Sequence, residues 1–183
     1  MPSYRQSAKI GAAITLFTLA AGAAHAQSIS GTIVSSILLE SACSIDGDAS
    51  PTGVDFGSLE FGIYSALFGE ADAQVADGSG ISVLCSPGVT ATFTLLNGSH
   101  DGEGSGEGSI HAMQHETQPA AYIGYTLYTD DARTTELPPT GTIELAEFEG
   151  GPITLDLYGR AFGNPGQLPA GYYEDTLQVQ LTW

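Results

Sequence analysis

The stretch GYYEDTLQVQLTW, residues 171–183, decides the fold class of this 183-residue chain. Its last eight residues alternate between apolar and polar side chains, and the apolar face carries Leu177, Val179, Leu181 and Trp183. A period of two residues is typical of a β-strand that is buried on one face only. We therefore expect a half-buried strand here. Such a strand needs neighbouring strands to pair with its backbone, and the question is which segments supply them.

Similar strand-like runs recur along the chain with turn residues between them, and no segment after residue 26 has a sustained period of 3.6 residues. The predicted class is therefore all-β, with about eight short strands in a sandwich of two antiparallel sheets. The predicted strands cover residues 29–39, 54–61, 80–85, 90–96, 122–128, 142–148, 153–158 and 173–183. The dipeptide Asn97-Gly98 predicts a hairpin turn, and the glycine-rich stretch 100–109 a mobile surface loop.

Residues 1–26 have the features of a secretory signal. Arg5 and Lys9 precede the apolar run 10–24, and Ala24-His25-Ala26 supplies a small-x-small cleavage site. The apolar run is short for a membrane span. We expect a mature chain that begins near Gln27, is exported and forms one domain.

The mature chain is strongly acidic. It keeps Arg133 and Arg160 as its basic residues against all 21 acidic ones, a formal charge of −19. Such a surface repels nucleic acid and anionic lipid, so no nucleic-acid partner is expected. A solvated acidic exterior is the simplest interpretation, and a saline habitat or cation binding are the alternatives.

Cys43 and Cys85 are the only two cysteines. In an exported protein they predict one disulfide. The bond would close a loop of about 40 residues, which is worth roughly 4 kcal/mol in the chain-entropy model.

Sequence signals for catalysis or metal binding are weak. His111 and His115 stand four residues apart and could place metal ligands on one helical face. Asp46-Gly47-Asp48 resembles the start of a calcium loop, but the later glycine and glutamate that such a loop requires are missing. No nucleophile elbow or phosphate-binding loop occurs. We expect no enzymatic activity, no metal and no cofactor.

Four stretches match the pattern of a known family. They are GSLEFG at 57–62, ISVLC at 81–85, YTLYTDDARTT at 125–135 and LYGRAFGNPGQLPAGYYEDTLQVQLTW at 157–183. Together they resemble the spore coat protein U domain, and more narrowly the major pilins of archaic (Csu-type) chaperone–usher pili. The most specific element is Gly171-x-Tyr173-x-Asp175, followed by the alternating strand. The resemblance covers essentially the whole mature chain.

The resemblance implies an immunoglobulin-like antiparallel sandwich that lacks its final strand. Such a fold leaves a hydrophobic groove open until a neighbouring subunit supplies a donor strand. Residues 27–40 would be the donor extension and residues 41–183 the incomplete domain. The donor face would present Ile29, Gly31, Ile33, Ile37 and Leu39, and the acceptor groove would be lined by Leu177, Val179, Leu181 and Trp183. From the pattern alone, an ordinary first strand of the same domain is the alternative for residues 29–39.

The resemblance also implies a function. The chain would be a structural pilin that polymerises by donor-strand complementation into a cell-surface pilus, after passage through the periplasm. Its partners would be identical or related pilins, a periplasmic chaperone and an outer-membrane usher, and the fibre would serve adhesion and biofilm formation. The alternative is a secreted monomeric β-sandwich that binds sugar or cations. Because Arg133 and Arg160 fall inside the matching stretches, we expect at least one of them to form a structural ion pair.

Overall fold

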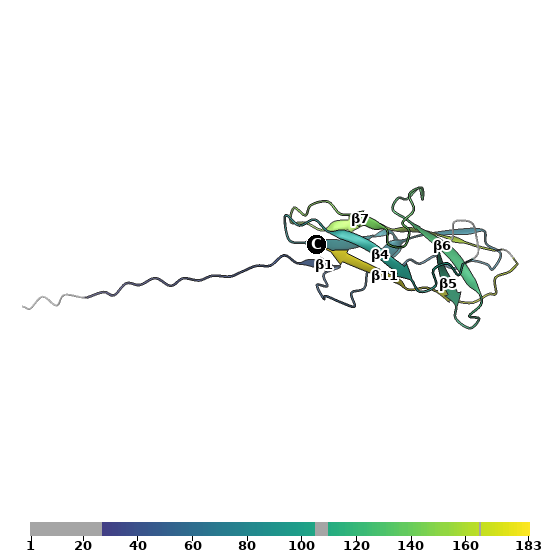
Figure 1. The fold of residues 1–183 in the computed structure, drawn as a ribbon, viewed down its shortest axis with the longest axis horizontal. Coiled ribbons are helices and arrows are strands. Elements are labelled where there is room, and N and C mark those ends of the chain that lie inside the picture. The colour runs from purple at the N-terminus through teal and green to yellow at the C-terminus, as the bar shows by residue number, and fades with distance from the viewer. Residues whose placement is uncertain (1–26, 105–109, 165) are drawn as a thin grey trace, which may run out of the picture. The chain divides into compact units, whose positions relative to one another are not determined.

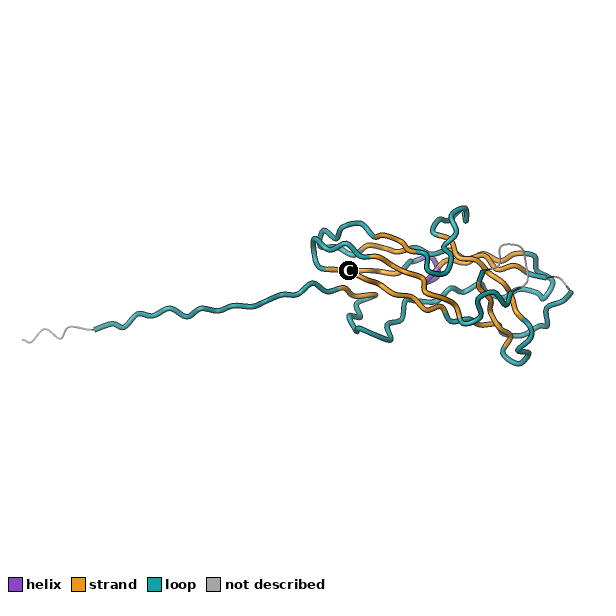
Figure 2. Tube along the Cα trace, viewed as in Figure 1, coloured by secondary structure: helices purple, strands orange, loops and turns teal. Residues whose placement is uncertain are grey.

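The computed structural model describes residues 27–104, 110–164 and 166–183, so the predicted signal segment lies outside the described residues. Within these ranges every regular element except one 3-10 turn is a β-strand (Figure 2). This confirms the predicted all-β class. The described part of the chain contains no helix that is long and apolar enough to cross a membrane.

The chain divides after Leu38 into two units. In the first unit, residues 27–38 have no assigned strand, and Ile29, Ile33 and Ile37 are 101%, 98% and 83% exposed. The strand predicted at 29–39 is therefore not observed. An extended segment becomes a strand only when its backbone groups pair with a neighbouring strand, and the alternation of side chains alone does not provide that pairing.

The second unit, residues 39–183, contains three antiparallel sheets (Figure 1). The first has the order β1-β3-β8, formed by β1 (Cys43–Ile45), β3 (Ile81–Cys85) and β8 (Ile153–Leu155). The second has the order β10-β5-β6-β9-β2, formed by β10 (Tyr173–Glu174), β5 (His111–His115), β6 (Tyr122–Tyr128), β9 (Tyr158–Phe162) and β2 (Glu70–Gln74). The third has the order β11-β4-β7, formed by β11 (Leu177–Thr182), β4 (Thr92–Gly98) and β7 (Thr142–Glu144). The 3-10 turn η1 (Val75–Gly78) follows β2.

Side chains from all three sheets meet in one hydrophobic core. Val83 of β3, Phe93 and Leu95 of β4 and Leu127 of β6 are almost completely buried within it. Alternate residues of β3 and β4 face inward, as a strand with one covered face requires. Antiparallel sheets packed around a shared core are the arrangement predicted for an immunoglobulin-like sandwich.

The predicted disulfide is confirmed. Cys43 and Cys85 are bonded, and they lie directly opposite each other in the β1–β3 ladder. The adjoining residues continue the pairing, because the Ser86 amide donates to the Ala42 carbonyl at 2.9 Å. The bond therefore fixes β1 to the sheet.

Several predicted strands differ from those observed. Residues 153–158 and 173–183 were each predicted as one strand, but each run divides into two strands that belong to different sheets, β8 with β9 and β10 with β11. The alternating residues 54–61 form no strand. Strands β2 and β5 were not predicted, because their sequences EADAQ and HAMQH contain no β-branched residue.

The turn prediction at Asn97-Gly98 is wrong. These residues are the end of β4 and lie opposite Gln178 and Leu177 of β11, and the chain turns only after them. A tight turn is found instead at Asp46-Gly47, where both residues have positive φ and the Ile45 amide donates to the Asp48 carbonyl. Of the predicted mobile loop 100–109, residues 105–109 lie outside the described part of the chain.

Both arginines bind the same carboxylate, as the expected ion pair required. Arg160 donates to the two Asp72 oxygens at 2.7 and 2.9 Å, and the Nε of Arg133 lies 3.3 Å from Asp72. Arg133 also donates to the carbonyls of Ala73 and Gly159. The hydrogen bond from Arg160 lowers the pKa of Asp72, so this carboxyl remains charged and ties β2 to β9.

Replacing Cys43 and Cys85 together by serine should lower the free energy of unfolding by roughly 4 kcal/mol, because the unfolded chain regains the entropy of an open loop. Urea unfolding of the purified chain at neutral pH measures the loss. The native chain with and without reductant is the control, and the reduced native protein should match the double variant. A double variant as stable as the oxidised protein would contradict the assignment of a stabilising role to this bond.

Candidate functional site

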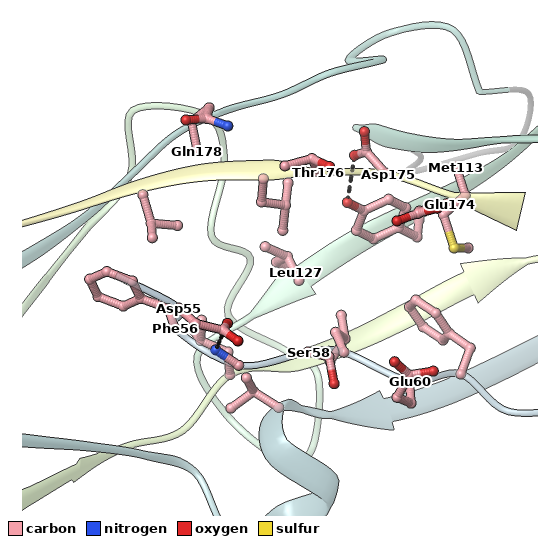
Figure 3. Close-up of a pocket in the computed structure, with 18 of the residues that line it drawn as sticks. Asp55, Phe56, Ser58, Glu60, Met113, Leu127, Glu174, Asp175, Thr176 and Gln178 are labelled. Atoms are coloured by element: carbon pink, nitrogen blue, oxygen red, sulfur yellow. Dashed lines mark hydrogen bonds between the residues drawn. The ribbon is translucent and has the colours of Figure 1, made fainter. Parts of the chain in front are cut away.

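A groove of about 1100 Å³ runs through the second unit between β11 and residues 54–61. Figure 3 shows Leu127 between the segment that carries Thr176 and Gln178 and the stretch that carries Asp55 and Phe56. Pockets for small molecules occupy about 300–1,000 Å³. The groove is therefore large enough for a segment of polypeptide.

Strand β11 forms one wall. Leu177, Val179 and Leu181 are half-buried and pack against the core, whereas the residues between them are exposed, which confirms the predicted alternation. Trp183 also lines the groove and is 57% exposed. Among the described residues β11 pairs only with β4, so the backbone on its groove side has no neighbouring strand.

Residues 54–61 form the opposite wall. Phe56, Leu59 and Phe61 pack inward against the core, and Gly159 of β9 allows this because a Cβ atom there would lie 2.6 Å from the Leu59 side chain. Few backbone groups of this stretch are bonded within the described residues: the Ser58 carbonyl accepts from the Ala76 amide, and other bonds are local. This wall therefore presents a second backbone edge.

The floor of the groove is apolar. It is formed by buried side chains of three strands, Ile81 of β3, Phe93 of β4 and Leu127 of β6. A channel with an apolar floor and a free backbone edge on each side can accept an extended segment. Such a segment would bond through its backbone and place alternate side chains on the floor.

Gly171 and Tyr173, two residues of the closing motif, pack against His115. A side chain at position 171 would collide with the imidazole ring, so glycine is required there. The Tyr173 hydroxyl donates to the Pro169 carbonyl at 2.8 Å, and its ring meets the His115 ring edge to face. The Tyr173 bond to the backbone upstream holds the chain in place ahead of β10.

Asp175, the third motif residue, lies where the chain passes from β10 to β11, and its side chain is 2% exposed. It accepts hydrogen bonds from the Tyr125 hydroxyl at 2.7 Å and the Ser99 amide at 3.1 Å, and His100 Nδ1 lies 3.2 Å away. Burial, followed by the charge of Asp175, raises the pKa of Tyr125, so the phenol keeps its proton and remains a donor. These bonds fix the first residues of the β11 wall.

A second carboxylate extends this network. Asp101 accepts from the Gly98 amide at 2.9 Å and pairs with Nδ1 of the buried His111, whose ring lies against Tyr125. A Cβ atom at position 98 would lie 2.5 Å from Asp101 and 2.7 Å from Asp175. Glycine is therefore present at the end of β4 because two carboxylates pack there, and not because the chain turns.

The metal interpretation of His111 and His115 is not supported by their geometry. Both residues lie on a strand. Nδ1 of His115 accepts from the Thr117 and Gln118 amides, and its Nε2 bonds to the Ala170 carbonyl. Nδ1 of His111 pairs with Asp101, whereas its Nε2 is buried without a hydrogen-bond partner among the described residues. Within the described ranges no three His, Cys, Asp or Glu side chains are grouped as metal ligands.

The structure places part of the predicted site together. The four predicted groove residues of 177–183 share one wall, but the role of Ile29, Gly31, Ile33, Ile37 and Leu39 stays a prediction. Sequence reasoning missed the opposite wall and the Asp101–His111 pair. The alternation in 54–61 was the available signal for the wall, although it was interpreted as a strand.

Comparison with known proteins gives one family. The model of the Spore Coat Protein U domain matches residues 29–180. A solved structure similar to this chain is the CsuC–CsuE chaperone–tip adhesion subunit pre-assembly complex from archaic chaperone–usher Csu pili of Acinetobacter baumannii, with a TM-score of 0.44 and 17% identity. The match covers 79% of this chain and spans 40% of that one. No curated protein matches the chain in sequence.

Replacing Asp175 by alanine should lower the free energy of unfolding by about 3 kcal/mol, because the buried Tyr125 hydroxyl loses its acceptor and the contact with His100 is lost. Urea unfolding at neutral pH measures the change. The matched control is Glu174→Ala, one residue away and exposed, which should stay within about 0.5 kcal/mol of the native chain. Equal effects of the two substitutions would show that the network does not support this part of the chain.

Proposed function

Since this chain belongs to the spore coat protein U domain family, we propose that it is a structural subunit of a chaperone–usher pilus, joined to its neighbours by donor-strand complementation. The proposal rests on one observation above all, the apolar groove beside β11 with a free backbone edge on each side. An incomplete sandwich of this kind is an aggregation hazard unless another strand covers it.

The segment that fits this groove is in the chain itself, at residues 27–39. Most of its apolar side chains fall at alternate positions, with Val34 and Leu38 as the exceptions, and it contains no charged residue. In a polymer, this segment of one subunit would lie in the groove of the next. Ile29, Ile33, Ile37 and Leu39 would contribute about 1.5–3 kcal/mol each when fully buried, before the cost of ordering the segment.

The side-chain pattern fixes the register of the donor. A shift by one residue would turn the aliphatic face outward and place Thr32 and several serines on the apolar floor. Gly31 has no side chain and suits a point where the donor backbone approaches the floor closely. Backbone bonds thus supply affinity, and the aliphatic side chains supply the register.

Assembly of such subunits would require two further proteins. A subunit with an open groove needs a temporary partner, so we propose a periplasmic chaperone that lends a strand and an outer-membrane usher at which the strands are exchanged. The mature chain would begin near Gln27 and reach the cell surface as part of a fibre. Adhesion to surfaces and biofilm formation are the functions we propose for that fibre.

Deleting residues 27–39 should abolish polymers, because the remaining domain can accept a strand but cannot donate one. Electron microscopy and gel electrophoresis of unboiled material from the cell surface would detect the loss. Fibres that persist in the deletion variant would contradict the proposal.

A pair of substitutions within the donor gives a finer test. Ile33→Asp should reduce polymer yield strongly, since a charge would face the apolar floor. Thr32→Asp places the same charge on the outward face and should leave polymers intact. Equal loss in both variants would point to a general effect of charge in this segment and not to the proposed register.

A secreted monomeric β-sandwich that binds sugar or cations would behave differently. The mature chain expressed alone in the periplasm would then elute from size exclusion as one sharp monomer peak. A pilin without its chaperone should aggregate, be degraded, or be recovered folded only with a copy of residues 27–39 in its groove. If a monomer is obtained, mapping whether residues 27–39 occupy the groove of their own domain separates a self-complemented pilin from a binder.

A further inference from the structure

A group of large apolar side chains is exposed near one end of the groove. Ile63, Leu67 and Tyr64 are 102%, 68% and 52% exposed, and Tyr172 is 58% exposed. We call these four residues the apolar rim. These four residues lie in segments 61–69 and 161–173. Neither segment contains Asp, Glu, Lys or Arg, although the chain has 21 acidic residues.

Backbone hydrogen bonds hold the loop 61–69, which carries three of the four rim residues. The Phe68 amide donates to the Ser65 carbonyl at 3.0 Å, and the Phe68 side chain packs against the core. The Gly163 amide then bonds to the Gly69 carbonyl at 2.6 Å and holds the loop against the end of β9. Because the loop is anchored at this end, the turn presents Leu67 to the outside.

The groove continues beyond β11 to this rim. Its lining includes Tyr64 and Phe68 on one side and Leu168, Pro169 and Tyr172 on the other. Phe61 lies against Tyr125, the partner of Asp175, so the residues that follow Phe61 continue past the start of β11. The wall provided by β11 is thus shorter than the groove.

The donor is also longer than β11. At about 3.3 Å per residue, the ten steps from Ile29 to Leu39 span about 33 Å, whereas the six steps from Leu177 to Trp183 span about 20 Å. About four donor residues must therefore lie beyond the β11 wall. Every ladder in the domain is antiparallel. A donor that runs antiparallel to β11 from Trp183 would bring residues 37–39 past Leu177, to the rim.

Val34 and Leu38 are the two apolar donor residues that would face away from the groove floor. In this register Val34 would lie beside β11, whereas Leu38 would lie beyond it. Leu38 stands between Ile37 and Leu39, so its side chain would point out of the groove, where the donor is otherwise mostly small and polar. An exposed apolar side chain at this end of the donor matches an exposed apolar surface at this end of the groove.

We propose that the apolar rim binds Leu38 of a second copy of this chain, and so forms a second contact between neighbouring subunits outside the groove. The inference rests on the proposed function, because the donor segment brings the two copies together. While residues 37 and 39 enter the groove, Leu38 packs on Ile63 and Leu67. The contact would cover apolar surface that otherwise faces water.

Cysteine cross-linking in assembled fibres tests the contact. The two native cysteines are bonded to each other, so introduced ones react alone. The full chain with Leu38→Cys and Leu67→Cys should give a ladder of covalent multimers on a non-reducing gel after mild oxidation, and reductant should remove it. The matched control combines Leu67→Cys with Thr32→Cys, whose donor position also points outward but would lie beside β11, and it should give no ladder.

A charge variant tests whether the contact matters for assembly. Leu67→Glu should reduce polymer yield about tenfold, since the contact would desolvate a charge. Leu84→Glu is the control, because Leu84 is also exposed but lies on β3 outside the groove lining, and it should polymerise normally.

The outcomes separate the two proposals. If the native chain forms no polymers that depend on residues 27–39, the proposed function fails. If such polymers form but the Leu38–Leu67 pair gives no ladder, or Leu67→Glu polymerises as Leu84→Glu does, the rim contact is overturned and the function stands. Polymerisation that is normal for purified Leu67→Glu while its export is lost would assign the rim to another partner and would also overturn the contact.

Discussion

Strand β11 can form backbone hydrogen bonds on its β4 side, and among the described residues no strand occupies its other side. This single unpaired edge explains the half-burial of Leu177, Val179 and Leu181, which touch the core without being closed over. Residues 54–61 on the opposite wall likewise pack inward without pairing to a strand. The groove thus lies between two stretches of backbone that no described strand joins.

The closing motif keeps this wall in place. Gly171 and Tyr173 fit against His115, and Asp175 bonds to β6 and to the end of β4. All of these contacts lie at the point where the chain leaves one sheet and enters another. Since buried polar groups are costly unless they are fully bonded, such a network specifies one path for the backbone. The β11 wall is therefore positioned by the domain itself and needs no occupant in the groove.

The sequence predicted the features that depend on local pattern. The alternating face of 177–183, the strand at 122–128 and the Cys43–Cys85 bond were all expected. The change of sheet at Asp175 was not, because the alternation of side chains continues across it and only the buried carboxylate marks the crossing. Gly98 was misread since its partners, Asp101 and Asp175, include one that is distant in sequence. The groove depends on backbone edges that no described strand pairs with, and residue spacing alone does not specify that pairing.

Arg133 and Arg160 both pair with Asp72. These are the only Lys or Arg side chains after residue 26, and both are paired with a carboxylate of the same domain, so its surface is overwhelmingly anionic. The fibre proposed above would be a polyelectrolyte whose sides repel the sides of other fibres. At physiological ionic strength this repulsion decays over about 8 Å. Fibres would therefore stay dispersed until they nearly touch, and lateral bundling would depend on the counterions of the medium.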